Sequence, residues 1–225
     1  MKRDKYMKKI LLIIVASLFS STIAFAEISI GASMSQSVFA AEGTEDNYDY
    51  LGTSKTTVKE YGAFSHAFPS VFVEVGNGNL GIGLNYVPST ISTPENINHQ
   101  VQGGQSSADT KVSADFTDLT TAYVIAKLPV WGMFVKAGIS SVDIDIKESG
   151  DVGTYNNTDT DGIMISIGTE LELANGFGLR GEITGYEFDD VDANNGKAAG
   201  SADANVVKVQ EMIGASATIS LVKNF

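Results

Sequence analysis

Hydrophobic and polar residues alternate along several segments of the chain, and residues 162–173 show the pattern most clearly. Ile163 and Ile165 fall on one parity, whereas Ser166 and Glu170 fall on the other. A period of two predicts a β-strand, because successive side chains leave the backbone on opposite sides of a sheet. Taken alone, the segment leaves open whether its aliphatic row faces a protein core or the outside.

The same alternation recurs, which predicts an all-β chain. We expect strands in 27–34, 70–75, 79–86, 117–128, 132–140, 162–173, 177–186 and 213–225. In residues 118–128 the facing stays open, since either the row from Ala122 to Leu128 or the row that contains Leu119, Tyr123 and Ile125 can be the outer one.

The connections alternate in length. Short turns with favourable residues are expected at 76–78, 129–132 and 174–176. Long polar loops are expected at approximately 41–60, 90–112, 147–161 and 189–205. Three short and four long connections join eight strands and place both chain ends on the short-turn side. Residues 60–69 are interpreted as the upper part of the second strand; as a separate hairpin arm they would raise the count to ten.

The N-terminus has the features of a secretory signal peptide. Basic residues precede an apolar run from Ile10 to Phe19, and small residues follow up to Ala26. The apolar run is shorter than the roughly 20 residues of a membrane-spanning helix. We therefore expect cleavage after Ala26 and a mature domain of residues 27–225; Met7 is an alternative start.

Charge and cysteine content narrow the function classes. The whole chain has 15 basic and 27 acidic residues, and the signal peptide contains five of the basic residues and one acidic residue, Asp4. The mature chain therefore has 10 basic and 26 acidic residues, a net charge of −16. Such a chain repels nucleic acid. It contains no cysteine, which excludes disulfides, thiolate metal sites and an N-terminal lipid anchor on cysteine.

No segment of the expected mature chain is apolar enough for a spanning helix, so a membrane location requires a closed barrel, which satisfies every backbone group. We predict a single antiparallel up-and-down transmembrane β-barrel. The aliphatic rows then face lipid and the carboxylate rows face the lumen. An eight-stranded barrel is just wide enough to be filled by its own side chains.

The inward rows carry charged residues close to the short turns. A buried carboxylate without a partner costs several kcal/mol, so we expect an ionic and hydrogen-bonded plug centred on Arg180 and Lys136. The predicted lumen network consists of Glu74, Lys136, Glu170, Glu172, Arg180 and Glu182.

Aromatic residues also follow the expected strand ends. Trp131 and Phe177 lie at short turns, and Tyr86, Tyr186 and Phe188 lie near the opposite edge. Their placement predicts aromatic girdles at the two membrane interfaces.

The C-terminal strand ends in Phe225 and resembles the last strand of Gram-negative outer-membrane β-barrels, where a terminal Phe serves as an assembly signal. Lys223 departs from that pattern, but a lysine at the membrane edge can snorkel. The whole of residues 27–225 resembles the small outer-membrane barrels that include the OmpA transmembrane domain, OmpX, OmpW and the opacity antigens. This chain ends at the barrel, so the peptidoglycan-binding domain of OmpA-like proteins is not expected.

The resemblance implies an integral outer-membrane protein with periplasmic termini and extracellular loops. Its expected partners are outer-membrane lipid, lipopolysaccharide and the barrel-assembly machinery, which reads the C-terminal strand. The leading hypothesis is a structural or surface-interaction role with a filled lumen. The alternative is an OmpW-like narrow channel for small solutes or ions, and the distant alternative is a lipid A-modifying enzyme.

Residues suited to catalysis or cofactor binding are sparse. The two histidines, His66 and His99, have no sequence pattern that pairs them with a serine and an acid. The loop that contains Asp190 and Asp192 lacks the glycine and glutamate positions of a calcium-binding EF-hand. We therefore predict no catalytic residue, no metal site and no cofactor.

Overall fold

The computed structural model describes residues 27–48, 54–100, 108–149, 155–197 and 204–225. The expected signal peptide, residues 1–26, lies outside these ranges. Within them, no helix is long and apolar enough to cross a membrane. The described chain is built from β-strands, as the alternating pattern predicted.

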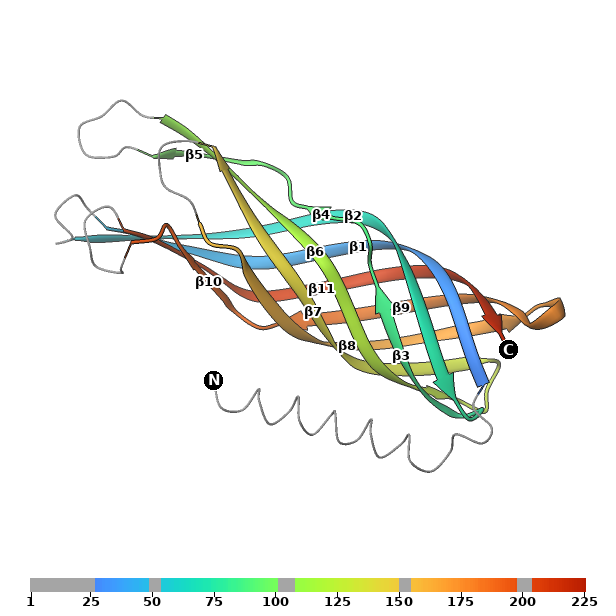
Figure 1. The fold of residues 1–225 in the computed structure, drawn as a ribbon. Helices are drawn as coiled ribbons and strands as arrows, with labels where there is room; N and C mark the ends of the chain where they lie inside the picture. Colours follow the sequence, from blue (N-terminus) through green and yellow to red (C-terminus); the bar gives the residue numbers. More distant parts are fainter. Residues whose placement is uncertain (1–26, 49–53, 101–107, 150–154, 198–203) are drawn as a thin grey trace.

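Eight antiparallel strands form a closed ring (Figure 1), which confirms the predicted fold class and strand count. Its order is β1-β2-β3-β6-β7-β8-β9-β11, and pairing of β1 with β11 closes it. The ring strands are β1 (Glu27–Tyr48), β2 (Lys55–Gly76), β3 (Leu80–Tyr86), β6 (Ala108–Lys127), β7 (Met133–Ser149), β8 (Thr158–Glu172), β9 (Phe177–Phe188) and β11 (Asn205–Asn224).

Three shorter strands pair with ring members without adding to the ring. Strands β4 (Ile91–Ser92) and β5 (Asn96–Gln100) pair with β6, and β10 (Val191–Asn194) pairs with β11. Residues 60–69 belong to β2, which stays in unbroken register with β1 from Gly76 to Lys55. The eight-strand interpretation of this segment is therefore correct.

The three short connections lie where the sequence predicted them, with a single-turn 3₁₀ segment at Ala174–Gly176. Among their described residues, the four long connections contain strand where loops were expected, most of all the connection between β1 and β2. Strand β1 continues as far as Tyr48, strand β2 already begins at Lys55, and strand β7 continues as far as Ser149. A strand with water on both faces can be polar on both of them, so these extensions lack the alternation that identified the other parts of the ring strands.

The extensions form two arms at the end of the barrel opposite the C-terminus (Figure 1). The first arm consists of β10 and the upper parts of β11, β1 and β2. The second arm consists of β5 and the upper parts of β6 and β7. Bulges in β11 and β6 lie below the arms, at Glu211 and Asp118, whose backbone φ angles are positive.

The outer surface of the ring carries a continuous band of exposed aliphatic side chains, here called the aliphatic belt. Ala122 in β6 and Leu128 directly after it are exposed, whereas Leu119 and Tyr123 are buried, which resolves the open facing of residues 118–128. The belt includes Ile28, Ile30, Met34, Val38, Val71, Val73, Leu80, Leu84, Val135, Ile163, Ile165, Ile167, Leu171, Leu179, Ile183, Ile213, Ile219 and Leu221.

Candidate functional site

The inward side chains nearest the short turns form an ionic cluster. Glu74 comes from β2, Lys136 from β7, Glu170 from β8, and Arg180 and Glu182 from β9. Each has the parity opposite to the aliphatic belt on its own strand, so strand alternation alone directs it into the lumen. Closure of the ring then brings four strands' charges into one layer.

Arg180 is the centre of this cluster and only 1% exposed. Its Nη1 and Nη2 donate to the two oxygens of Glu74 at 2.7 and 2.9 Å. Its Nη2 and Nε also donate to Glu170 Oε2 at 2.7 and 3.2 Å. The planar guanidinium thus binds one carboxylate through both oxygens and a second from the side, an arrangement that a lysine ammonium cannot reproduce.

Lys136 lies beside this group and is also buried. Its Nζ lies 2.7 Å from Glu182 Oε2 and 3.5 Å from Glu74 Oε1. Three aromatic rings surround the ammonium, with centroids at 4.6 to 5.4 Å: Tyr123, Phe134 and Phe72. The cation therefore has both carboxylate partners and π-faces to offset the loss of its hydration.

Polar neighbours bind the remaining carboxylate oxygens. Tyr123 donates its hydroxyl to Glu74 at 2.8 Å, and Ser166 donates to Glu182 at 2.7 Å. Asn224 Nδ2 donates to Glu170 at 3.0 Å. The sequence analysis missed these contributions, together with the Phe72 and Phe134 rings. The sequence did contain a signal for the two rings, since Phe72 lies two residues before Glu74 and Phe134 lies two residues before Lys136. Each ring therefore points to the same side of its strand as the charged residue.

Of the six residues predicted for the lumen network, the structure brings five together. Glu172 is exposed and makes none of these contacts. It lies at the last position of β8, opposite Gly178, where water reaches the barrel rim and no buried partner is needed. Two cations therefore meet three carboxylates in the cluster.

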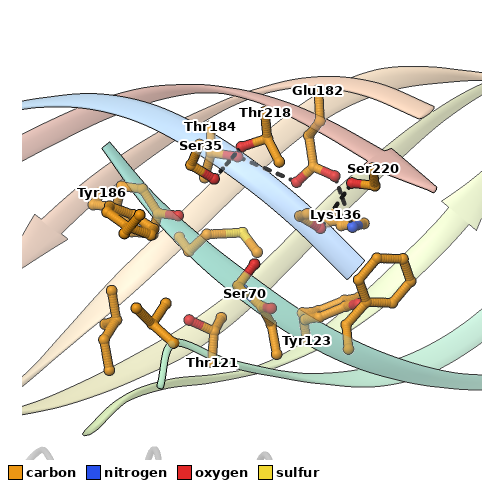
Figure 2. A pocket seen from close by; sticks show the side chains of 17 residues that line it. Ser35, Ser70, Thr121, Tyr123, Lys136, Glu182, Thr184, Tyr186, Thr218 and Ser220 are labelled. Atoms are coloured by element: carbon orange, nitrogen blue, oxygen red, sulfur yellow. Dashed lines mark hydrogen bonds and ion pairs between the residues drawn. The ribbon is translucent and has the colours of Figure 1, made fainter. Parts of the chain in front are cut away.

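A cavity of about 30 Å³ lies beside the ionic cluster (Figure 2). Lys136, Glu182 and Tyr123 border it on one side, and it is otherwise lined largely by hydroxyl groups from several strands. Ser35 and Thr218 are hydrogen-bonded to each other at 2.8 Å. A polar space of this size holds about one or two water molecules.

An apolar cluster fills the lumen on the arm side of the cavity. Its buried members are Phe68, Val87, Ile91, Leu119 and Val142. Aromatic rings extend it around the wall, with centroid distances of 5.5 to 6.3 Å along the series Phe64, Phe39, Tyr186 and Phe188.

Two of these rings correct the predicted girdles. Tyr186 and Phe188 pack inside the barrel, because they share the inward parity of Arg180 on β9. Tyr86, Trp131 and Phe177 do point outward, as a girdle requires.

His66 belongs to no catalytic arrangement among the described side chains. His66 is half-buried and lies opposite Ser37 in the register of β1 and β2. The buried Ser37 hydroxyl has no hydrogen-bond partner in the described part of the chain, so the two residues do not form a nucleophile–base pair. The side chain of His99 lies outside the described residues.

Phe225, the predicted assembly signal, is exposed at the end of β11. Its backbone N–H donates to Ile28 O at 2.9 Å, so the last residue takes part in closing the ring. The Lys223 ammonium lies over the Phe177 and Phe225 rings, at 5.0 and 5.4 Å from their centroids.

Comparisons with known proteins place the fold. No protein-family model matches the chain, and no curated protein matches its sequence. Solved structures do match. The outer membrane protein OprG from Pseudomonas aeruginosa is 12% identical with a TM-score of 0.58, over 89% of this chain and 96% of OprG.

Two further matches are similar in extent. The outer membrane protein AlkL is 11% identical with a TM-score of 0.47, over 87% of this chain and 90% of AlkL. Neisserial surface protein A is 13% identical with a TM-score of 0.36, over 84% of this chain and 97% of that protein.

The likeness to OprG and the closed ring agree on the architecture. The aliphatic belt supplies the surface that such a ring turns to hydrocarbon, and the charged residues are enclosed within it. The chain therefore has the fold of the small outer-membrane β-barrels and is built as an integral membrane protein.

Proposed function

We propose that the chain is a closed structural barrel of the outer membrane that displays two strand-built arms at the cell surface. The observation that carries this proposal is the position of Arg180 across the lumen. Strands β9 and β2 are three steps apart around a ring in which four is the maximum. The Arg180–Glu74 pair is therefore a brace through the interior rather than a contact along the wall.

Further contacts support a closed lumen. Lys136 on β7 joins Glu182 on β9 and reaches Glu74 on β2, so both cations tie opposite parts of the ring. The apolar cluster fills the lumen on the arm side of the small cavity. A solute would have to displace both layers, at the expense of several charge-assisted hydrogen bonds.

Electrical recording tests this proposal. The purified protein, inserted into a planar bilayer, is expected to show no steady conductance. Insertion in the same sample is checked by the heat-dependent shift in gel mobility that folded barrels show. A steady, resolvable pore in the unmodified protein contradicts the closed-barrel proposal.

A narrow channel is the second candidate, favoured by the position of Lys136 between two carboxylates. If Lys136 turns from Glu182 to Glu74, it competes with Arg180 for Glu74 and loosens the brace. The substitution Glu182→Gln removes the charge that holds Lys136 in place, so this candidate expects a rise in conductance. A current that remains at baseline in Glu182→Gln counts against it.

The arms define the surface role. They rise from the end opposite Glu27 and Phe225, which we assign to the cell exterior, with those two residues on the periplasmic side. Cross-strand ion pairs stabilise them: Lys59 binds Glu42 at 2.5 Å, Lys55 binds Asp46 at 2.9 Å, and Lys147 pairs with Asp115. We propose that the belt contacts outer-membrane lipid, that the zone above it contacts lipopolysaccharide, and that the strand ending in Phe225 is read by the assembly machinery.

A further inference from the structure

One row of inward side chains crosses six neighbouring strands without an apolar member. Residues that lie directly opposite each other in a β-ladder share a face of the sheet, so the row can be followed from one strand to the next. We call it the polar row. From β7 to β2 it consists of Lys136, Ser166, Thr184, Ser216, Ser37 and His66, each directly opposite the next.

The polar row climbs through the barrel past the apolar cluster. Lys136 lies three residues after Met133, where β7 begins, whereas His66 lies ten residues before Gly76, where β2 ends at the same side of the barrel. A row across tilted strands winds along the barrel axis, so this one leads from the ionic cluster toward the arms. The buried members of the apolar cluster come from β2, β4, β6, β7 and the segment between β3 and β4. The row therefore passes that cluster along the wall formed by β1 and β11.

Two hydroxyl groups in the upper half of the row need a further partner. Ser37 and Ser216 lie directly opposite each other and are 1% and 4% exposed. Neither Oγ atom makes a hydrogen bond within the described part of the chain. Leaving two buried hydroxyls unpaired is unfavourable, whereas one bridging water satisfies both. The Tyr186 hydroxyl lies near Ser216 and supplies a third polar neighbour, so the geometry suits a bound water.

The lower half of the row borders the polar cavity. Thr184, Glu182 and Lys136 follow one another along one side of it (Figure 2). Glu182 accepts hydrogen bonds from Lys136 and Ser166, both at 2.7 Å, and from Thr184 at 3.2 Å. Tyr186 also lines the cavity and so joins it to the space beside Ser216. Water in the cavity therefore contacts a hydrogen-bonded chain that leads from a carboxylate to the upper half of the row.

Both ends of this chain approach water. At the upper end His66 is half-buried rather than enclosed. At the lower end Lys136 Nζ lies 3.5 Å from Glu74 Oε1 as well as 2.7 Å from Glu182. Glu74 borders a second cavity of about 20 Å³ at the short-turn end, and the exposed residues Glu27 and Lys127 also line that cavity. A space of this size holds about one water molecule.

We propose that the polar row, together with the water it binds, conducts protons through a barrel that is closed to larger solutes, and the proposal thus rests on the closed lumen proposed above. Each water or hydroxyl oxygen takes up a proton on one side as it releases its own on the other. Lys136 passes a proton to Glu74 as it takes one from Glu182, so every group ends with the protons it began with.

Charge and width select the proton over other ions. The three carboxylates of the ionic cluster outnumber its two cations, which favours an excess proton and disfavours an anion. A metal cation would have to separate the hydrogen-bonded side chains in order to pass, whereas a proton moves without displacing them.

Proton flux into lipid vesicles tests the path. The folded protein is inserted into phosphatidylcholine vesicles that enclose the pH-sensitive dye pyranine, and the external pH is stepped with potassium and valinomycin present to balance charge. We expect the pH difference to decay faster than in protein-free vesicles, while the same preparation shows no steady potassium chloride conductance in a planar bilayer. Equal decay with and without protein overturns the proton path and leaves the closed barrel standing. A steady conductance contradicts the closed barrel and, with it, the path.

Two double variants of the same shape locate the path. Ser37→Val with Ser216→Val should return the decay to the rate of protein-free vesicles, because apolar side chains exclude the bridging water. Ser37→Thr with Ser216→Thr has nearly the same bulk but keeps both hydroxyls, and it should retain the flux. Equal flux in the two double variants, whether high or low, would show that these hydroxyls do not conduct and would overturn the proposal.

The control is a buried hydroxyl outside the row. Ser140 is fully buried on β7 and hydrogen-bonded to Thr121 at 2.8 Å, and Ser140→Ala should leave the flux unchanged. A loss equal to that of the Val variant would show that any disturbed lumen hydroxyl stops the flux, which rejects the polar row as the path. Insertion of every variant is checked by heat-dependent gel mobility, and the flux of the native chain decides the proposal if the Val variant does not fold.

Discussion

At the scale of single residues, the structure depends most on how buried charges are satisfied. Arg180 is shared between Glu74 and Glu170, and Lys136 between Glu182 and Glu74. In a narrow lumen such groups are stable only as a set, since removal of one leaves another buried without a partner. The cluster therefore rigidifies the barrel interior and selects one arrangement of its side chains.

The first prediction concerns Arg180. The substitution Arg180→Met should destabilise the barrel by about 3–5 kcal/mol, because Glu74 and Glu170 are left without their main cation. Urea unfolding in lipid vesicles measures the change. The matched control is Glu172→Gln, at the carboxylate two residues after Glu170 on β8. It should alter the free energy of unfolding by less than about 0.5 kcal/mol because Glu172 is exposed. Similar losses in the two variants would contradict a buried brace at Arg180.

At the scale of elements, the arms and the ring strands obey different rules. In the ring, one face meets lipid and the other the packed lumen, so strict alternation is required. In the first arm, Glu42 and Asp46 continue the parity of Met34 and Val38 on β1, and the ion pairs with Lys59 and Lys55 leave Glu42 buried and Asp46 half-buried. Ion pairs across β1 and β2 take over from aliphatic contacts with the membrane.

The second prediction is a pH dependence of the first arm. Hydrogen bonds from Lys59 and Tyr61 hold the pKa of Glu42 below its usual value of 4.5, and those from Thr57 and Lys55 lower the pKa of Asp46. A carboxyl group with a lowered pKa in the folded state stabilises that state above its usual pKa and loses the effect as the pH falls. The arm should therefore lose protection against amide hydrogen exchange at about pH 3 relative to pH 7, after correction for intrinsic rates.

The ring strands provide an internal reference for that experiment, since their protection should change less. The double variant Glu42→Gln with Asp46→Asn cannot titrate at these positions, and its arm should show the same protection at both values of pH. An equal acid-induced loss in the double variant and the native chain would show that other groups control the arm.

At the scale of the whole molecule, a closed ring separates two environments. The aliphatic belt surrounds the outside, and the ionic cluster, the hydroxyl-lined cavity and the apolar cluster follow one another along the inside. No strand could bury its own charges alone. Only closure between β1 and β11 gives every inward row an enclosed space and removes the free strand edges.

The third prediction tests which surface faces lipid. Ile165 is 65% exposed in the belt, and Asp159 is exposed on the same face of β8, above the belt. Ile165→Arg should cost about 2–4 kcal/mol in vesicles, because an arginine near the bilayer midplane is poorly solvated. Asp159→Arg should be neutral or slightly stabilising, since Asp143 lies directly opposite on β7. If both variants unfold at the same urea concentration, the assigned belt is wrong.

Much of this architecture follows from the sequence, for identifiable reasons. Ile163 and Glu170 reveal a two-faced strand because their alternation reflects contact with two different surroundings. The turn at Ala174–Gly176 was predictable because Asn175 and Gly176 accept positive φ angles, which the structure shows. Inward parity near the short turns was enough to name Glu74, Lys136 and Arg180 as neighbours.

Other features are not encoded in local pattern. The arms were expected to be loops because strands in water on both faces carry no lipid signal. Tyr186 and Phe188 were placed in a girdle because an aromatic near a strand end suits either face. Glu172 was placed in the cluster because parity does not indicate how far the enclosed lumen extends toward the rim.

Local sequence pattern is enough to identify the alternating parts of the ring strands, their facing in most of the ring, the short turns and the supply of charges for the lumen, since each is set by residues close together along the chain. Which charges meet, how the apolar cluster fills the lumen and where the arms begin are known only from the folded ring. Those outcomes depend on curvature, on register across the ring and on the bulges at Asp118 and Glu211. Glu170 already lies opposite Arg180 in the register of β8 and β9, whereas Glu74 is distant in sequence and only ring closure brings it to Arg180.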